Sequence, residues 1–154
     1  MYQRILVPVD GSPTSNAGLA EAIKLAKPAG ARLRLVHVID EMPYVMSAEG
    51  YGAMSGDVLG MLKESGERVL AQARAQVEKA GVAVDSVLFD SLRSRLADCV
   101  AAQTREWGAD LIVLGTHGRR GVQRMLLGSD AEQMARAATV PVLLVRSAEP
   151  AASA

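Results

Sequence analysis

The sequence predicts an α/β fold, a single domain of three layers in which a parallel five-stranded sheet lies between helices. Five short apolar runs alternate along the chain with segments whose apolar residues recur at helical spacing. Most of these runs are continuous, which is typical of strands that are covered on both faces. The chain has 154 residues, of which 49% are hydrophobic and 22% charged. These values fit one domain with its own core and exclude a disordered chain.

The first strand and the first helix are predicted close to the amino terminus. Residues 4–9 (RILVPV) form a short apolar run that the following DGSP segment breaks. Ser12 or Thr14 can cap a helix that begins near Pro13, because proline suits the first helical turn. We expect this helix to stop at Lys27-Pro28, with Gly30 following, because a proline removes a hydrogen bond inside a helix.

The middle of the chain predicts two further strands and a long helix between them. Residues 31–39 form the second strand, and a connection without a convincing period follows at residues 40–56. Its methionines and tyrosines either cover a ligand crevice or form an apolar contact surface. Residues 57–80 carry apolar residues at helical spacing, and residues 82–89 form the third strand.

The last third of the chain predicts two helices and two strands. A helix over residues 92–107 keeps Cys99 on its inner face, where we expect an inert buried thiol. Residues 110–114 and 140–145 form the fourth and fifth strands, and a short helix begins near Ser129 between them. The first and fourth strands are the most apolar on both sides and are therefore expected at the centre of the sheet.

Composition excludes several classes of function. Seventeen basic residues balance 17 acidic ones, which argues against a duplex nucleic-acid binder with its basic face. Cys99 is the only cysteine and no cluster of histidine and cysteine occurs, so neither a disulfide framework nor a structural zinc site is expected. The sequence has no membrane-spanning apolar stretch and no signal peptide, and we expect a cytoplasmic protein.

A glycine-rich segment, GTHGRRGVQRMLLGS, follows the fourth strand at residues 115–129 and gives the strongest chemical signal. Glycine lets backbone N–H groups approach an anion closely, and the start of the next helix adds a positive dipole end. Three arginines add positive charge, so phosphate is the natural ligand. The spacing is neither that of a Walker A loop nor that of the dinucleotide-binding fingerprint. A long turn without ligand is the alternative.

The position of this segment in the predicted sheet supports a binding role. In such sheets ligands bind at the carboxyl ends of strands, where the strand order reverses. The segment Asp10-Gly11-Ser12 also follows a strand, so both loops are expected to line one crevice. Asp10 fits equally as a residue that caps the first helix or accepts hydrogen bonds from its own turn.

Four blocks of the sequence, in order, resemble the ATP-binding branch of the universal stress protein family. They are RILVPVDGS, LVHVID, the glycine segment with its G-x2-G-x9-G-S spacing, and PVLLVR. The resemblance implies an adenine nucleotide alpha hydrolase-like sheet in the order 3-2-1-4-5. It also implies a family domain over residues 1–147 with a flexible tail at residues 148–154, and a homodimer. The dimer would pair through residues 140–146, an edge strand with little protection.

The resemblance further implies an adenine nucleotide as ligand: ATP, with ADP and AMP as alternatives. By resemblance, the adenine and the ribose would contact Pro8, Val9, Asp10 and Val38. The ribose and the inner phosphates would contact Gly115, Thr116, Gly118, Arg119, Arg120 and Gly121. The terminal phosphate would contact Gly128, Ser129, Asp130 and Ala131. Asp130 stands where that branch commonly has a small apolar residue. A carboxylate there repels a triphosphate unless it points away or shares a Mg²⁺ ion.

Three functions are compatible with these residues. The first is a nucleotide-binding regulatory protein of stress responses, the second a slow ATP hydrolase or phosphotransferase, and the third a dimeric protein without nucleotide. Phosphoryl transfer needs carboxylates that hold a metal and an aligned nucleophile. No second acidic residue is convincingly placed with Asp10, and the sequence therefore favours the binding protein.

Overall fold

The computed structural model describes residues 1–39, 56–89, 95–116 and 128–147. Its five strands are all parallel and follow the order β3-β2-β1-β4-β5, which confirms the predicted fold class. The strands are β1 (Arg4–Pro8), β2 (Arg32–Val38), β3 (Ala83–Phe89), β4 (Leu111–Gly115) and β5 (Val142–Val145). The helices are α1 (Pro13–Ala29), α3 (Gly56–Lys79), α4 (Leu96–Trp107) and α5 (Ser129–Ala137). The predicted tail at residues 148–154 and most of the connection at residues 40–56 lie outside the described ranges.

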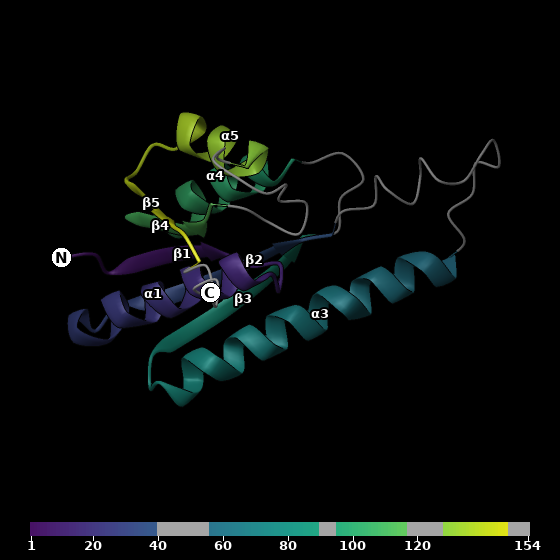
Figure 1. Ribbon diagram of the computed structural model, residues 1–154, viewed down its shortest axis with the longest axis horizontal. Coiled ribbons are helices and arrows are strands. Elements are labelled where there is room, and N and C mark those ends of the chain that lie inside the picture. The colour runs from purple at the N-terminus through teal and green to yellow at the C-terminus, as the bar shows by residue number, and fades with distance from the viewer. Residues whose placement is uncertain (40–55, 90–94, 117–127, 148–154) are drawn as a thin grey trace, which may run out of the picture.

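In the described part of the chain, α1 and α3 cover one face of the sheet, and α4 and α5 cover the other (Figure 1). On one face α1 and α3 enclose a core with Leu19 and Val77 from the helices and Leu33 from β2. On the other face α4 and α5 enclose a second core, which includes Val100 and Met134. β1 lies at the centre of the sheet and β4 beside it, and apart from their end residues both are buried. The prediction that the first and fourth strands are interior is therefore confirmed.

Helix α1 begins as predicted but ends later. Ser12 is its N-cap, with a hydroxyl that accepts from the Ser15 N–H at 3.1 Å, and Pro13 occupies the first helical position. The expected stop at Pro28 is wrong, because the helix continues to Ala29. A proline so close to the end removes one hydrogen bond, and Gly30 supplies a left-handed cap (φ 62°) whose N–H turns back to the last helical carbonyls.

Helix α4 begins later than the sequence suggested. Its first helical residue is Leu96 rather than residue 92, because Arg95 has an extended backbone (φ −69°, ψ 149°) and its carbonyl accepts the first helical N–H bonds. Asp98 then lies in the first turn, where a carboxylate favours the helix start. Cys99 is 4% exposed, as its predicted inner position requires.

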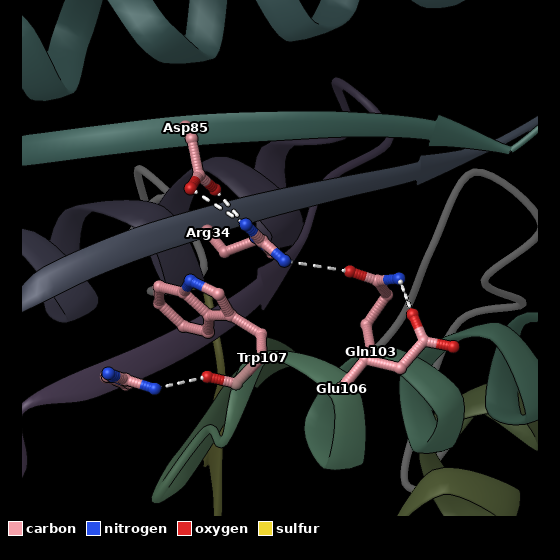
Figure 2. Close-up of polar contacts among 6 residues, drawn as sticks. Arg34, Asp85, Gln103, Glu106 and Trp107 are labelled. Atoms are coloured by element: carbon pink, nitrogen blue, oxygen red, sulfur yellow. Dashed lines mark hydrogen bonds and ion pairs between the residues drawn. The ribbon is translucent and has the colours of Figure 1, made fainter.

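A polar cluster attaches the end of α4 to β2 and β3 (Figure 2). Arg34 donates to both carboxylate oxygens of Asp85 at 2.7 and 2.9 Å and to the Gln103 side chain at 3.1 Å. Its guanidinium carbon lies 4.8 Å from the centre of the Trp107 ring. The bonds to Asp85 raise the pKa of Arg34, and burial opposes this rise. The cluster lies on the face of the sheet that α4 covers (Figure 2).

Within the described ranges, no helix is both long enough and apolar enough to cross a membrane.

Candidate functional site

The strand ends at which a ligand is predicted to bind are those of β1 and β4, where the strand order reverses. β1 ends at Pro8, and Val9 and Asp10 follow it; Pro8 and Val9 are buried, whereas Asp10 is partly exposed. β4 ends beside it in Gly115 and Thr116. A parallel sheet binds ligands at such a point because its two halves are connected in opposite directions there.

The turn from β1 into α1 holds Asp10 by two hydrogen bonds. The Asp10 N–H donates to the Ser15 hydroxyl at 3.1 Å, and one Asp10 carboxylate oxygen accepts from the Ser12 N–H at 2.8 Å. Between them Gly11 has φ 78°, a left-handed conformation that favours glycine. Asp10 therefore does hydrogen-bond with its own turn, while Ser12 caps the helix.

His37 anchors the same end of β1 from the neighbouring strand. Its Nδ1 lies 2.7 Å from the Val9 carbonyl oxygen, and because a carbonyl only accepts, Nδ1 carries the proton. α3 packs against this ring at Gly66, where an added Cβ would lie 2.9 Å from His37 Cδ2. His37 is therefore a partly buried residue of β2 that is hydrogen-bonded to the end of the neighbouring strand.

Two glycines bring α1 into direct contact with β4. A Cβ on Gly115 would lie 2.5 Å from the Thr14 carbonyl oxygen, and a Cβ on Gly18 would lie 3.1 Å from the Gly115 nitrogen. Gly115 thus has a packing reason for its identity besides any role toward a ligand. The backbones meet closely here, and this contact places the start of α1 beside the end of β4.

Backbone hydrogen bonds close the two ends of the glycine segment. Thr116, which is 5% exposed, donates its N–H to the Val145 carbonyl at 2.9 Å. The Gly128 N–H then donates to the Thr116 carbonyl at 2.8 Å. Gly118, Arg119, Arg120 and Gly121 lie between these ends, outside the described residues. The segment thus leaves β4 and enters α5 at nearly the same point.

The N-cap of α5 is a glycine. Gly128 is the N-cap and offers no side-chain hydrogen bond, in contrast to Ser12 on α1. Ser129 and Asp130 are exposed, whereas Ala131 is 3% exposed and packs into the core. A helix start without a capping side chain presents its N–H groups to an anion.

The predicted residues therefore gather at one end of the sheet. The described ones lie on three adjacent strand ends and on α5: Pro8, Val9, Asp10, Val38, Gly115, Thr116, Gly128, Ser129, Asp130 and Ala131. Within the described ranges, no group of three or more histidine, cysteine, aspartate or glutamate side chains is placed to hold a metal ion. A separate surface groove of about 440 Å³ lies between α3 and β3 and includes Glu67 and Arg74.

Sequence reasoning missed three residues that shape this site: Ser15, Gly18 and Gly66. An isolated glycine inside a helical pattern is a signal for close packing, and both glycines carried it. Ser15 carried no such signal, because its bond to Asp10 depends on how the turn folds.

Solved structures share this fold. The structure of the hypothetical protein MJ0577 matches with a TM-score of 0.81 at 25% identity, over 97% of this chain and 99% of that chain. Two others are complexes. One is a universal stress protein in complex with cAMP, with a TM-score of 0.65 at 24% identity, over 96% of this chain and 99% of that chain. Another is the universal stress protein from Archaeoglobus fulgidus in complex with dAMP, with a TM-score of 0.67 at 22% identity, over 94% of this chain and 98% of that chain.

The sequence identifies the family. Residues 1–146 match the universal stress protein family. The universal stress protein MJ0531 of Methanocaldococcus jannaschii is 33% identical over 147 residues, 95% of this chain and 83% of the relative. A family member from Burkholderia pseudomallei is 32% identical with a TM-score of 0.71, over 96% of this chain and 97% of that one. The chain therefore belongs to the universal stress protein family.

Proposed function

We propose that this protein binds an adenine nucleotide at the carboxyl ends of β1, β2 and β4, and acts as a regulatory module in stress responses. One observation carries the proposal. The start of α5, whose N-cap Gly128 makes no side-chain hydrogen bond, is hydrogen-bonded to Thr116 at the end of β4, at the point where the strand order reverses beside Asp10. These features would place a helix start that can bind an anion beside the polar turn at Asp10.

The end of β2 suits the base. The Arg32 N–H donates to β1, and the Val36 carbonyl accepts from the Val9 N–H, so even-numbered residues of β2 turn their backbone groups toward β1. Val38, the last residue of β2, follows this pattern beyond the end of β1. Its N–H and C=O would face the crevice, and adenine offers an acceptor and a donor side by side on its Watson–Crick edge.

The first strand suits the ribose. Asp10 is held by its turn with one carboxylate oxygen on the Ser12 N–H, and a carboxylate accepts strongly from hydroxyl groups. Pro8 and Val9 are buried beneath it and would form the floor of the base and ribose pocket. We assign the ribose to Asp10 and the base to Val38.

The start of α5 suits the phosphates. The N–H groups of Ser129, Asp130 and Ala131 form its first turn and would donate to the terminal phosphate. Gly115 and Thr116, followed by Gly118, Arg119, Arg120 and Gly121, would surround the ribose and inner phosphates. ATP fits this reach best. ADP and AMP lack the phosphate that extends furthest, and Mg²⁺ would enter only where Asp130 faces the phosphate.

Relatives support an adenine nucleotide. One solved universal stress protein is a complex with cAMP and another is a complex with dAMP. Both ligands contain adenine and phosphate, the two parts that the crevice of this chain is suited to hold.

We further propose a homodimer through residues 140–146. β5 is an edge strand in which Leu143 and Leu144 are 36% and 37% exposed. Two copies that pair antiparallel along this edge would satisfy its outward backbone groups and cover these side chains.

The nucleotide proposal is tested by what the purified protein carries and binds. We expect mass spectrometry of the denatured protein to release ATP, and calorimetry of the stripped protein to give a dissociation constant on the order of micromolar. Gly128→Val should weaken ATP binding at least about tenfold, because the added side chain would cover the N–H groups at the start of α5. The variant should still fold, since any residue can adopt the φ of −58° at this position.

Gly60→Val is the matched control, since Gly60 lies on α3 and an added Cβ there meets nothing within 4 Å. It should bind ATP as the wild type does. Release of ADP with measurable turnover would instead indicate a hydrolase. Wild-type protein that carries no nucleotide and gives no binding heat with ATP, ADP or AMP would refute the proposal.

A further inference from the structure

The peptide unit between Val9 and Asp10 is held at both ends by side chains rather than by strand pairing. His37 Nδ1 donates to the Val9 carbonyl at 2.7 Å, and the Asp10 N–H donates to the Ser15 hydroxyl at 3.1 Å. The two side chains come from different elements, β2 and α1, on either side of the end of β1. This peptide unit is therefore fixed where the first strand opens into the crevice.

These two bonds are not needed to begin the helix. Ser12 already caps α1 with its own hydroxyl, and the Asn16 N–H donates to the Ser12 carbonyl at 2.9 Å. The Ser15 hydroxyl accepts from a residue that precedes the cap. Its effect falls on Asp10, whose carboxylate the Ser12 N–H holds at 2.8 Å.

His37 has a second fixed contact. The helix α3 approaches its ring at Gly66, where even a methyl group would lie 2.9 Å from Cδ2. The ring is thus confined between α3 and the Val9 carbonyl. The position of Val9, and through it of Asp10, is linked to the packing of a helix on the α1 and α3 face of the sheet.

We propose that Ser15 and His37 are positioning residues that fix the Asp10 carboxylate for the ribose hydroxyls, so that the site prefers ribonucleotides to 2′-deoxyribonucleotides. This inference rests on the nucleotide site proposed above. A carboxylate that is already held in place gains a strong hydrogen bond to a hydroxyl without first being ordered. Deoxyribose lacks one of the two hydroxyls, and a fixed carboxylate cannot move to compensate.

The ratio of dissociation constants for dATP and ATP measures this effect. We expect the wild type to bind ATP about tenfold more tightly than dATP. Ser15→Ala should lower the ratio to about two, because the binding of ATP becomes weaker while the binding of dATP changes little. His37→Phe, which keeps a ring but removes the donor, should do the same from a different element.

Two control variants separate positioning from stability. Ser12→Ala removes the helix cap but keeps the Asp10 bond to Ser15, so it should lower the unfolding midpoint and keep the ratio. Ser86→Ala makes the same chemical change in β3, at the groove beside α3, and should change neither. A purely structural role for Ser15 would make Ser15→Ala resemble Ser12→Ala.

Each outcome decides the inference. A ratio near one in the wild type, or a ratio unchanged in both Ser15→Ala and His37→Phe, overturns it while the nucleotide site stands. If Ser15→Ala does not fold, His37→Phe decides alone. A wild type that binds neither ATP nor dATP refutes the proposed function, and the positioning role falls with it. The positioning role is supported if the ratio falls in Ser15→Ala and His37→Phe and stays at the wild-type value in both control variants.

Discussion

Two carboxylates at the crevice are held in different ways. Asp10 is partly exposed and fixed by its turn, with hydrogen bonds on its N–H and on its carboxylate. Asp130 is exposed in the first turn of α5, beside the N–H groups that we assign to the phosphate. The first is suited to bind hydroxyl groups, whereas the second opposes a phosphate unless a cation lies between them.

We predict that Asp130→Ala tightens metal-free ATP binding about threefold to tenfold, because a negative charge near the triphosphate is removed. The same change should abolish any dependence of affinity on Mg²⁺. Calorimetric titrations with Mg²⁺ and with a chelator measure both effects. Asp98→Ala, which removes the exposed first-turn carboxylate of α4, should leave ATP binding unchanged. Equal affinities in all four titrations of wild type and Asp130→Ala would mean that Asp130 serves only its helix.

At this scale the sequence predicts residue types better than it predicts their contacts. Asp10, Thr116 and Gly128 lie at strand and helix ends that turn residues already mark. The bonds from Asp10 to Ser15 and from His37 to Val9 join residues whose proximity depends on tertiary packing. The identity of Gly115 likewise suggested a ligand loop, and only the approach of Thr14 reveals its packing role.

Among the elements, α3 packs on the sheet with Leu70, Ala73 and Val77, and its backbone comes close to β2 and β3 at Gly66. An added Cβ at Gly66 would lie 2.9 Å from both His37 and Leu88, whereas one at Gly60 on the same helix meets nothing within 4 Å. A substitution to alanine raises the helix propensity at both positions, but it crowds neighbouring side chains only at Gly66. A comparison of the two variants therefore separates these two effects on stability.

We predict that Gly66→Ala destabilises the protein by about 1–2 kcal/mol, since overpacking at His37 outweighs the higher helix propensity of alanine. Gly60→Ala should instead stabilise it by about 0.5–1 kcal/mol. Urea unfolding measures both. Gly66→Ala should also weaken ATP binding, because the added methyl group displaces the His37 ring that holds the Val9 carbonyl. Two variants of equal stability and equal ATP affinity would contradict this role of the glycine.

Element types could be predicted from the sequence, whereas some boundaries could not. Apolar spacing and capping residues indicate every strand and helix of the described chain. The end of α1 beyond Pro28 depends on the left-handed cap at Gly30, and the start of α4 depends on the extended backbone of Arg95. Both are local conformations that several backbone bonds decide together.

The two edges of the sheet differ. At β3, Arg34 and Asp85 place paired charges beside the edge, and Trp107 packs against them (Figure 2). At β5 the Pro141 and Val145 carbonyls accept hydrogen bonds from β4, so odd-numbered residues face β4 and even-numbered ones face outward. The backbone groups of Leu144 thus point away from the sheet, where a second copy would pair.

We predict that the wild type sediments as a dimer at tens of micromolar and that Leu144→Pro sediments as a folded monomer. The proline removes an outward N–H and leaves the hydrogen bonds to β4 in place. Leu143→Pro removes an inward N–H and should lower the thermal midpoint more. A monomeric wild type at this concentration, or a dimeric Leu144→Pro, would refute pairing through β5.

The architecture of the molecule was predictable in part from physics and in part from resemblance. Alternating strands and helices predict a parallel sheet with two helical layers, and the structure has both. The order of the strands came from the resemblance, because periodicity alone does not say which apolar strand lies beside which. Once this order is known, the crevice between β1 and β4 follows from topology.

The central claim is that an adenine nucleotide binds at the carboxyl ends of β1, β2 and β4, and amide chemical-shift mapping during an ATP titration tests it most directly. We predict saturable shifts of the amide signals of Asp10, Val38, Thr116 and Ser129, and no shifts in the groove between α3 and β3 around Ser86. Shifts confined to that groove, or no shifts at millimolar ATP, would contradict it.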